Sequence, residues 1–209
     1  MRNISFNVYS INELPQSAQK AAIEQYRWDI CDNVMECFSS DYRQSLQKFM
    51  ELTNCDVPRW HVDYGGYGFT MKSDSELYYD FKTDESITAE YLTGKLLHRY
   101  VRNNIVPYLL EYKIYRKNGK RRCSKIIQTY DCPLTGTCYD IPLTDTIMDY
   151  YLHPNKYPGI TYKKLLDICL NDFFKSWHKE YRYWADDESA IKQEMEAREW
   201  EFTIDGTKY

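Results

Sequence analysis

The chain opens on alternating hydrophobic and polar residues. Ile4, Phe6 and Val8 alternate with polar neighbours, which predicts a half-buried strand. The segment SINE at positions 10–13 has the form of a capping box, and Pro15 follows it. Because proline is favoured at the first position of a helix, the pattern predicts a long helix that begins near Pro15.

Hydrophobic residues then recur at helical spacing. An i, i+4 ridge faces the predicted core and consists of Leu14, Ala18, Ala22, Tyr26 and Ile30. A second helix is predicted from about residue 40 to residue 52, with Leu46, Phe49 and Met50 on one side.

The middle of the chain mixes strand and helix patterns. Residues 57–72 alternate around Gly65-Gly66, which predicts two strands joined by a tight turn. Residues 75–83 predict a strand or a short helix, and residues 87–100 have near-helical spacing. Pro107 kinks the chain or starts a further helix that runs through Tyr112 to Tyr115. The sequence KNGKR around Gly119 predicts a turn, and residues 124–131 predict a strand.

The C-terminal third is helical in pattern. Residues 143–154 predict a helix capped near Thr144 and stopped by Pro154. Thr161 begins a long helix with an apolar face, and residues 186–200 form a second, acidic helix. The fold class is therefore α+β: a helix-rich single domain over residues 1–209 with a small antiparallel sheet. If the domain is subdivided, the pattern places the boundary near residues 82–86.

Composition adds one unusual feature. Aromatic residues make up 16% of the 209 residues, with 21 tyrosines among them, so a core is easily built. Tyrosines also suit a wet binding surface, although the favoured interpretation is that most of them line the rim of the core. No apolar run is long enough for a membrane span, and no signal peptide is apparent. The seven scattered cysteines are expected to be free thiols in a reducing cytoplasm.

Charge is unevenly distributed along the chain. The formal net charge is only −4, but residues 113–125 hold seven basic residues and no acid, while residues 186–201 are strongly acidic. Basic groups neutralise phosphates and tyrosines stack on unpaired bases, and the same patch also suits an acidic protein surface. A solvated basic turn with no partner explains the run equally well. The candidate partner-binding residues are Tyr112, Lys113, Tyr115, Arg116, Lys117, Lys120, Arg121, Arg122 and Lys125.

Other candidate chemistry has simpler explanations. Cys132 and Cys138, with Cys123 upstream, lack the close pairs of a structural zinc site and are expected to be buried thiols in a turn. The segment YGGYGF lacks the lysine and Ser/Thr of a phosphate loop, so a hairpin turn is favoured. The acids at 186–188 suit a helix N-terminus. We expect no catalytic residues, no metal and no cofactor.

Several segments together resemble a known family. They are VYSINELPQSAQKAAIEQYR, CPLTGTCYDIPLTD, LNDFFKSWHKEYRYW and EFTIDGTKY, and they resemble a family of phage and prophage accessory proteins. Some members carry the label of antitoxins of toxin–antitoxin stability systems. The resemblance implies a phage context, in which small proteins often inhibit host defence systems by stoichiometric binding. It supplies no functional residues.

The leading expectation is a non-enzymatic, phage-encoded inhibitor in the host cytoplasm. It would bind a nucleic-acid-directed defence effector, or its guide RNA or DNA, as an anti-CRISPR protein does. The acidic segment could then mimic nucleic acid. Two alternatives stay open: an antitoxin that masks a small toxin, and a nucleotide-sequestering protein or nuclease whose acids and histidines are brought together by folding.

Overall fold

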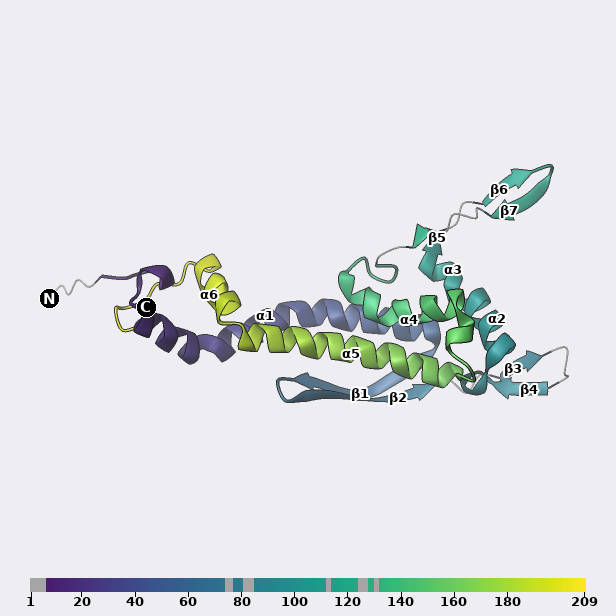
Figure 1. Ribbon diagram of the computed structural model, residues 1–209, viewed down its shortest axis with the longest axis horizontal. Helices are drawn as coiled ribbons and strands as arrows, with labels where there is room; N and C mark the ends of the chain where they lie inside the picture. Colours follow the sequence, from purple (N-terminus) through teal and green to yellow (C-terminus); the bar gives the residue numbers. More distant parts are fainter. Residues whose placement is uncertain (1–6, 74–76, 81–84, 112–113, 124–127, 130–131) are drawn as a thin grey trace. The chain divides into compact units, whose positions relative to one another are not determined.

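The computed structural model describes residues 7–73, 77–80, 85–111, 114–123, 128–129 and 132–209. They form two compact units: residues 1–39 with 178–209, and residues 40–177. We call them the terminal unit and the central unit. Two long helices, α1 (Gln16–Thr53) and α5 (Tyr162–Asp186), each contribute to both (Figure 1). The subdivision expected near residues 82–86 falls mostly outside the described residues.

The terminal unit holds the ends of the described chain. It contains the 3-10 turn η1 (Ile11–Glu13), the first part of α1, the last part of α5, and α6 (Glu188–Ala197). The predicted capping box is present: Ser10 donates its N–H to the Glu13 carboxylate at 2.8 Å. It caps η1, however, and α1 starts three residues after Glu13. Tyr9 pairs with Phe202 in an isolated antiparallel bridge.

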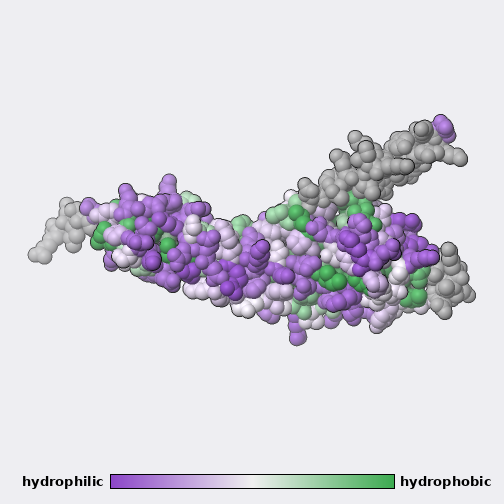
Figure 2. Space-filling view, viewed as in Figure 1, coloured by the Kyte–Doolittle hydropathy of each residue, from purple (hydrophilic) through white to green (hydrophobic). Residues whose placement is uncertain are grey.

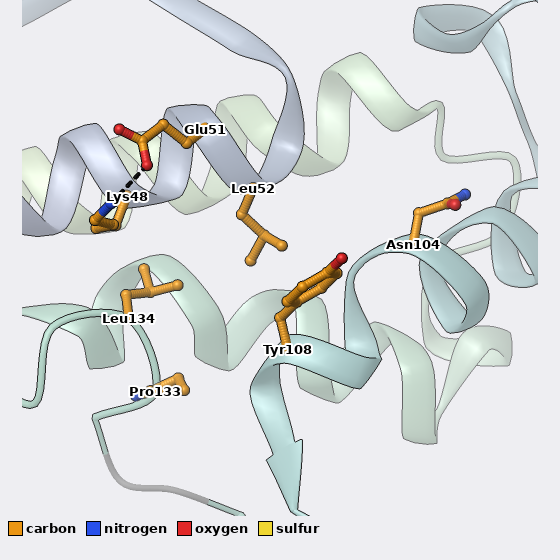
Figure 3. Close-up of a pocket in the computed structure, with 7 residues that line it drawn as sticks. All are labelled: Lys48, Glu51, Leu52, Asn104, Tyr108, Pro133 and Leu134. Atoms are coloured by element: carbon orange, nitrogen blue, oxygen red, sulfur yellow. Dashed lines mark hydrogen bonds and ion pairs between the residues drawn. The ribbon is translucent and has the colours of Figure 1, made fainter.

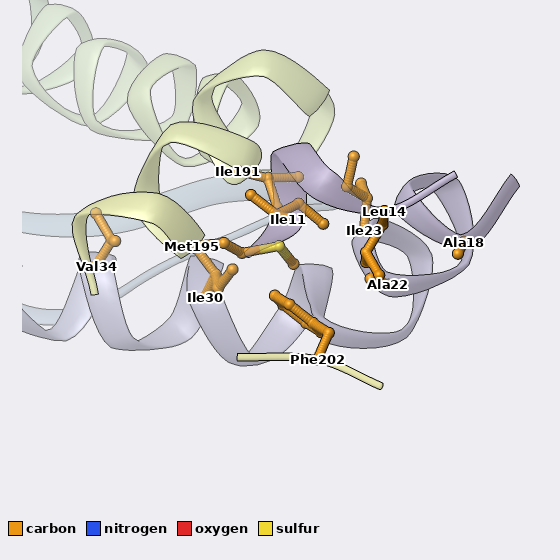
Figure 4. Close-up of a cluster of buried hydrophobic side chains, with 10 residues drawn as sticks. All are labelled: Ile11, Leu14, Ala18, Ala22, Ile23, Ile30, Val34, Ile191, Met195 and Phe202. Atoms are coloured by element: carbon orange, nitrogen blue, oxygen red, sulfur yellow. The ribbon is translucent and has the colours of Figure 1, made fainter. Parts of the chain in front are cut away.

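The core of the terminal unit confirms the predicted helical ridge. Figure 4 shows its buried side chains, which come from η1, α1, α6 and the C-terminal segment: Ile11, Leu14, Ala18, Ala22, Ile23, Ile30, Val34, Ile191, Met195 and Phe202. Tyr26 packs against this cluster and meets Trp200 edge-on at 5.7 Å. Hydrophobic burial therefore joins segments that are far apart in the sequence.

Gly206 closes the C-terminal segment against α1. Its φ is +92°, and a Cβ built there would lie 2.5 Å from the Ala18 carbonyl oxygen. We expect Gly206→Ala to destabilise the terminal unit by about 2–4 kcal/mol, because left-handed strain and a backbone clash combine. Gly159→Ala is the control, since Gly159 has φ +69° but a Cβ added to it would meet nothing within 4 Å; it should cost only about 1–2 kcal/mol. Urea unfolding measures both, and equal losses would contradict the clash.

The central unit contains most of the β-structure. Its strands are β1 (Cys55–Asp63), β2 (Gly66–Ser73), β3 (Leu77–Asp80), β4 (Glu85–Thr88), β5 (Leu110–Glu111), β6 (Ile114–Lys117), β7 (Lys120–Cys123) and β8 (Gln128–Thr129). Within the described residues they form separate two-stranded antiparallel ladders, β1–β2, β3–β4, β5–β8 and β6–β7. The helix-rich α+β class is confirmed. The strand predicted around Ile4, Phe6 and Val8 lies mostly outside the described residues, and Tyr9, just after it, pairs with Phe202.

The central unit also contains several helices. Besides parts of α1 and α5 they are α2 (Gly94–Asn104), α3 (Val106–Leu109) and α4 (Ile141–Leu152), with 3-10 turns at Ala89–Tyr91, Cys138–Asp140 and Pro154–Lys156. The Tyr42 ring of α1 stacks on Trp177 of α5 at 4.5 Å. From β1, Trp60 lies 5.0 Å from the Trp177 ring. Contacts between aromatic rings thus join α1 and the β1–β2 hairpin to α5.

The surface is mainly hydrophilic on the face that Figure 2 presents, and hydrophobic residues form small separate groups on it. Among the described residues, no helix is both long and apolar enough to cross a membrane.

Candidate functional site

The basic run forms the β6–β7 hairpin. Its turn is Asn118-Gly119, whose φ angles are +53° and +71°. Two successive positive φ values match the tight turn that suits the twist of a hairpin, and Asn-Gly is its most favoured sequence. The expected turn at KNGKR is confirmed, whereas the expected helix through Tyr112 to Tyr115 is wrong because Ile114–Lys117 is a strand.

The register of this hairpin pairs residues of like charge. Arg116 is the partner of Arg121, and Lys117 is the partner of Lys120. Like charges directly opposite each other destabilise an antiparallel pair. The hairpin therefore concentrates four cationic residues at a cost to its own stability.

Six of the predicted partner-binding residues lie in this hairpin. They include Tyr115 and Arg122, which form the next pair of the ladder after Arg116 and Arg121. The remaining three, Tyr112, Lys113 and Lys125, lie outside the described residues.

A shorter ladder connects the hairpin to the helices. β5 pairs with β8 through Leu110–Thr129 and Glu111–Gln128. β5 follows α3 directly, and both Leu109 and Leu110 are buried. β5 is therefore fixed to the core of the central unit, and β8 is held beside it by the ladder. We call the described residues of these four strands, 110–111, 114–123 and 128–129, the basic arm.

A pocket of about 450 Å³ lies where the basic arm joins the central unit (Figure 3). One wall comes from the last turns of α1, with Leu52 and an ion pair in which Lys48 Nζ lies 2.7 Å from Glu51 Oε2. The second wall comes from Asn104, the last residue of α2, and Tyr108 of α3. Tyr108 is 69% exposed, which is high for an aromatic residue beside a pocket.

The third wall is the loop that follows β8, with Pro133 and Leu134. Asp140, which is fully buried, holds this loop in place. Its carboxylate accepts hydrogen bonds from the N–H groups of Leu134 at 2.8 Å, Thr135 at 2.7 Å and Gly136 at 3.2 Å. Three consecutive N–H groups directed at one carboxylate satisfy a buried charge that would otherwise be costly.

Two hydroxyls complete the Asp140 network. Ser45 of α1 donates to Oδ1 at 2.7 Å, and Thr135 donates its Oγ1 to the same oxygen at 2.9 Å. α4 begins at Ile141, with Asp140 as its N-cap residue, so the helix start expected near Thr144 is three residues late. The carboxylate makes no helix-capping bond because it is turned toward the loop. Sequence reasoning missed this role, since an Asp before a helix is usually a cap.

The cysteines of this loop differ from expectation. Cys138 is exposed and Cys132 is half-buried, so the expected burial of both thiols is wrong. Burial raises the pKa of Cys31 to about 11. Over the described ranges, no group of three or more His, Cys, Asp or Glu side chains is placed to hold a metal ion.

The acidic segment of the terminal unit makes mostly local contacts. Asp187 caps α6 by accepting from Ser189 N at 2.8 Å and Ala190 N at 3.1 Å, as the sequence predicted for this acidic cluster. Asp186 pairs with Arg182, and Glu194 pairs with Arg198. These acids stabilise helix ends and helix faces, so the segment gives little support to nucleic-acid mimicry.

A second pocket, of about 430 Å³, lies between α2 and the loop after α4. Tyr157 lines it and donates to Asp149 at 2.7 Å. Burial and this hydrogen bond raise the pKa of Tyr157 to about 12. Hydrogen bonds from Lys156, Tyr157 and His153 hold the pKa of Asp149 well below its ordinary value. The Asp149 carboxyl therefore stays ionised and the Tyr157 hydroxyl stays protonated near neutral pH, as suits a structural loop.

Comparison of the chain with protein-family models, with curated proteins and with solved structures finds no match in any of the three. The site therefore rests on its own geometry: a basic arm with opposed cations, and a pocket at its base.

Proposed function

We propose that the protein is a non-enzymatic binding protein that uses the basic arm to engage an anionic partner. The partner is a nucleic-acid-directed defence effector of the host, as for an anti-CRISPR protein. The observation that carries the proposal is the register that places Arg116 opposite Arg121 and Lys117 opposite Lys120.

A bound polyanion offsets the cost of this register. In the free protein the opposed cations repel each other. A polyanion placed against the hairpin reverses the sign of the interaction and releases the counterions that the hairpin and the polyanion held. The tight Asn118-Gly119 turn sets the spacing of the cations before binding, so little ordering entropy is lost at the turn.

The phage context of the proposal comes from the resemblance of segments such as VYSINELPQSAQKAAIEQYR to phage accessory proteins. Small inhibitors of this kind work by occupying a surface of their target. A basic arm suits an effector because such effectors carry a phosphate backbone as guide or target.

The test is capture of the partner by tagged protein from lysates that contain CRISPR effectors, at low and at high salt. We expect one effector complex to be retained at low salt and lost at high salt, because exposed charges are screened within about 10 Å at 0.1 M salt. A complex that is insensitive to both salt and charge reversal in the hairpin would contradict the proposal. If the protein retained regardless of salt and of charge reversal is a small toxin, the result would favour an antitoxin instead.

A further inference from the structure

The pocket at the base of the basic arm combines features that the proposed function does not use. Its volume of about 450 Å³ lies within the range of small-ligand sites. Leu52, Pro133 and Leu134 give it apolar walls, while Asn104 and the Lys48–Glu51 pair are polar. Figure 3 shows Leu52 of α1 and Tyr108 of α3 beside the same space. A planar, mostly apolar group with polar edges fits such a lining.

Tyr108 is the most informative residue of this pocket. Its side chain is 69% exposed although it lies at the edge of a packed unit. An exposed aromatic ring presents a face on which another planar ring can stack, and base–aromatic stacking is worth about 1–3 kcal/mol per base. Asn104 donates its Nδ2 to the Tyr100 carbonyl at 3.1 Å, so its Oδ1 is the amide atom that remains to accept from a base amino group.

Chain length limits the distance between the pocket and the opposed cations. Tyr108 precedes β5 by two residues, and Arg116 is eight residues beyond Tyr108. Since an extended residue spans at most about 3.6 Å, the two residues lie within about 29 Å of each other. A strand of a few nucleotides bridges that distance. Stacking rings next to a basic track are the usual means of holding single-stranded nucleic acid.

We propose that the basic arm and this pocket together bind single-stranded nucleic acid, with an unpaired base stacked on Tyr108 and the adjoining phosphates along the hairpin. The proposal rests on the proposed function and names its polyanion. A duplex cannot use the pocket, because its bases are stacked on each other and paired. The pocket thus selects single strands, and the arm supplies most of the affinity.

The test uses the full chain and a fluorescein-labelled oligouridine of about 12 nucleotides, within the range of site sizes known for such grooves. A blunt duplex of equal length is the comparison. We expect the single strand to bind more tightly. Tyr108→Ala should weaken binding about 5–150-fold, the range that corresponds to one stacked base, and Tyr108→Phe should retain it. The slope of affinity against salt should be unchanged in Tyr108→Ala, because the lost contact is uncharged.

Tyr91→Ala is the matched control. Tyr91 is also an exposed tyrosine of the central unit, at 60%, but it lies in the turn before α2 and does not line the pocket. Its removal should leave affinity for the single strand unchanged. An equal loss of affinity in Tyr108→Ala and Tyr91→Ala would show nonspecific binding to exposed tyrosines and would overturn the pocket assignment.

Failure of this inference is distinguishable from failure of the proposed function. If Tyr108→Ala binds like the wild type while charge reversal in the hairpin abolishes binding, the pocket is wrong and the arm stands. If no oligonucleotide binds but effector capture still depends on the hairpin, the partner is an acidic protein surface and single-strand binding is overturned. If neither oligonucleotide binding nor effector capture depends on the hairpin, both proposals are wrong.

Discussion

Replacing Asp140 with alanine is expected to lower the free energy of unfolding of the central unit by about 3–5 kcal/mol, the largest effect on stability that we predict. The carboxylate accepts from three consecutive backbone N–H groups and from two hydroxyls. Alanine removes the one acceptor that the N–H groups of Leu134, Thr135 and Gly136 share. The hydroxyls of Ser45 and Thr135 keep only their contacts with each other and with Thr137.

Thermal and urea unfolding measure this loss. For a chain of this size the expected fall in the melting temperature is on the order of 10 °C. Hydrogen exchange locates it, because the amides of Leu134, Thr135 and Gly136 should lose protection before the core of α5 does. Asp145→Asn is the control on the same helix, because Asp145 is an exposed acid that takes no part in the Asp140 network. Equal losses in the two variants would show that the network has no special role.

Charge reversal at Arg121 should weaken binding of the anionic partner by about 10–100-fold at low salt, since one phosphate contact is lost and a repulsive one replaces it. The same change should stabilise the free hairpin. In Arg121→Glu the new carboxylate would stand opposite Arg116, and an opposite-charge pair contributes about 0.2–1 kcal/mol relative to a neutral one. Affinity and hairpin stability are thus expected to move in opposite directions.

Three further variants make this test specific. Arg116→Glu should reproduce the effect, because it forms the same pair with the charges exchanged. The double variant R116E/R121E restores a like-charge pair, so hairpin protection should fall again while binding stays weak. Lys20→Glu changes the net charge equally on the terminal unit, at an exposed residue, and should leave affinity almost unchanged. Amide exchange and binding titrations read out both properties, and a parallel loss of affinity and of hairpin order would contradict the register argument.

Strong local patterns were enough to predict several elements from the sequence. The alternation around Trp60 and Phe69 predicted β1 and β2, although the turn is at Tyr64-Gly65 and not at Gly65-Gly66. α5 and α6 follow their apolar faces and N-terminal residues, with Lys164 N donating to Thr161 at 3.2 Å. Each of these signals lies within a few residues of the structure it specifies.

Elements that depend on distant contacts were predicted poorly. α1 is one helix of 38 residues and not two. The polar stretch around Ser39 and Ser40 suggested a break, but Tyr42 and Phe49 continue the buried stripe, and tertiary packing overrides weak helix propensity. Likewise, Ile87 lies in β4 because it pairs with Tyr78, a partner that helical spacing alone does not reveal.

The candidate site was also only partly predictable from the sequence. Its charge is visible in residues 113–125, because a run of cations needs no fold to be recognised. The strand register, the pocket and the Asp140 network are not visible. Asp140 meets Ser45 across 95 positions of sequence, and Leu52, Tyr108 and Pro133 share a pocket only after folding.

The discontinuous terminal unit has a consequence for synthesis on the ribosome. Its core joins Ile23 and Ile30 to Ile191 and Phe202, and the whole central unit, residues 40–177, lies between the two segments. At about 5–20 residues per second, translation takes on the order of ten seconds to supply the missing half. The central unit is continuous in sequence and is complete at an earlier stage of translation. The first part of α1 therefore leaves the ribosome with its apolar stripe exposed to solvent, because the residues that cover it are synthesised last. Chaperones are expected to bind this stripe in the interval.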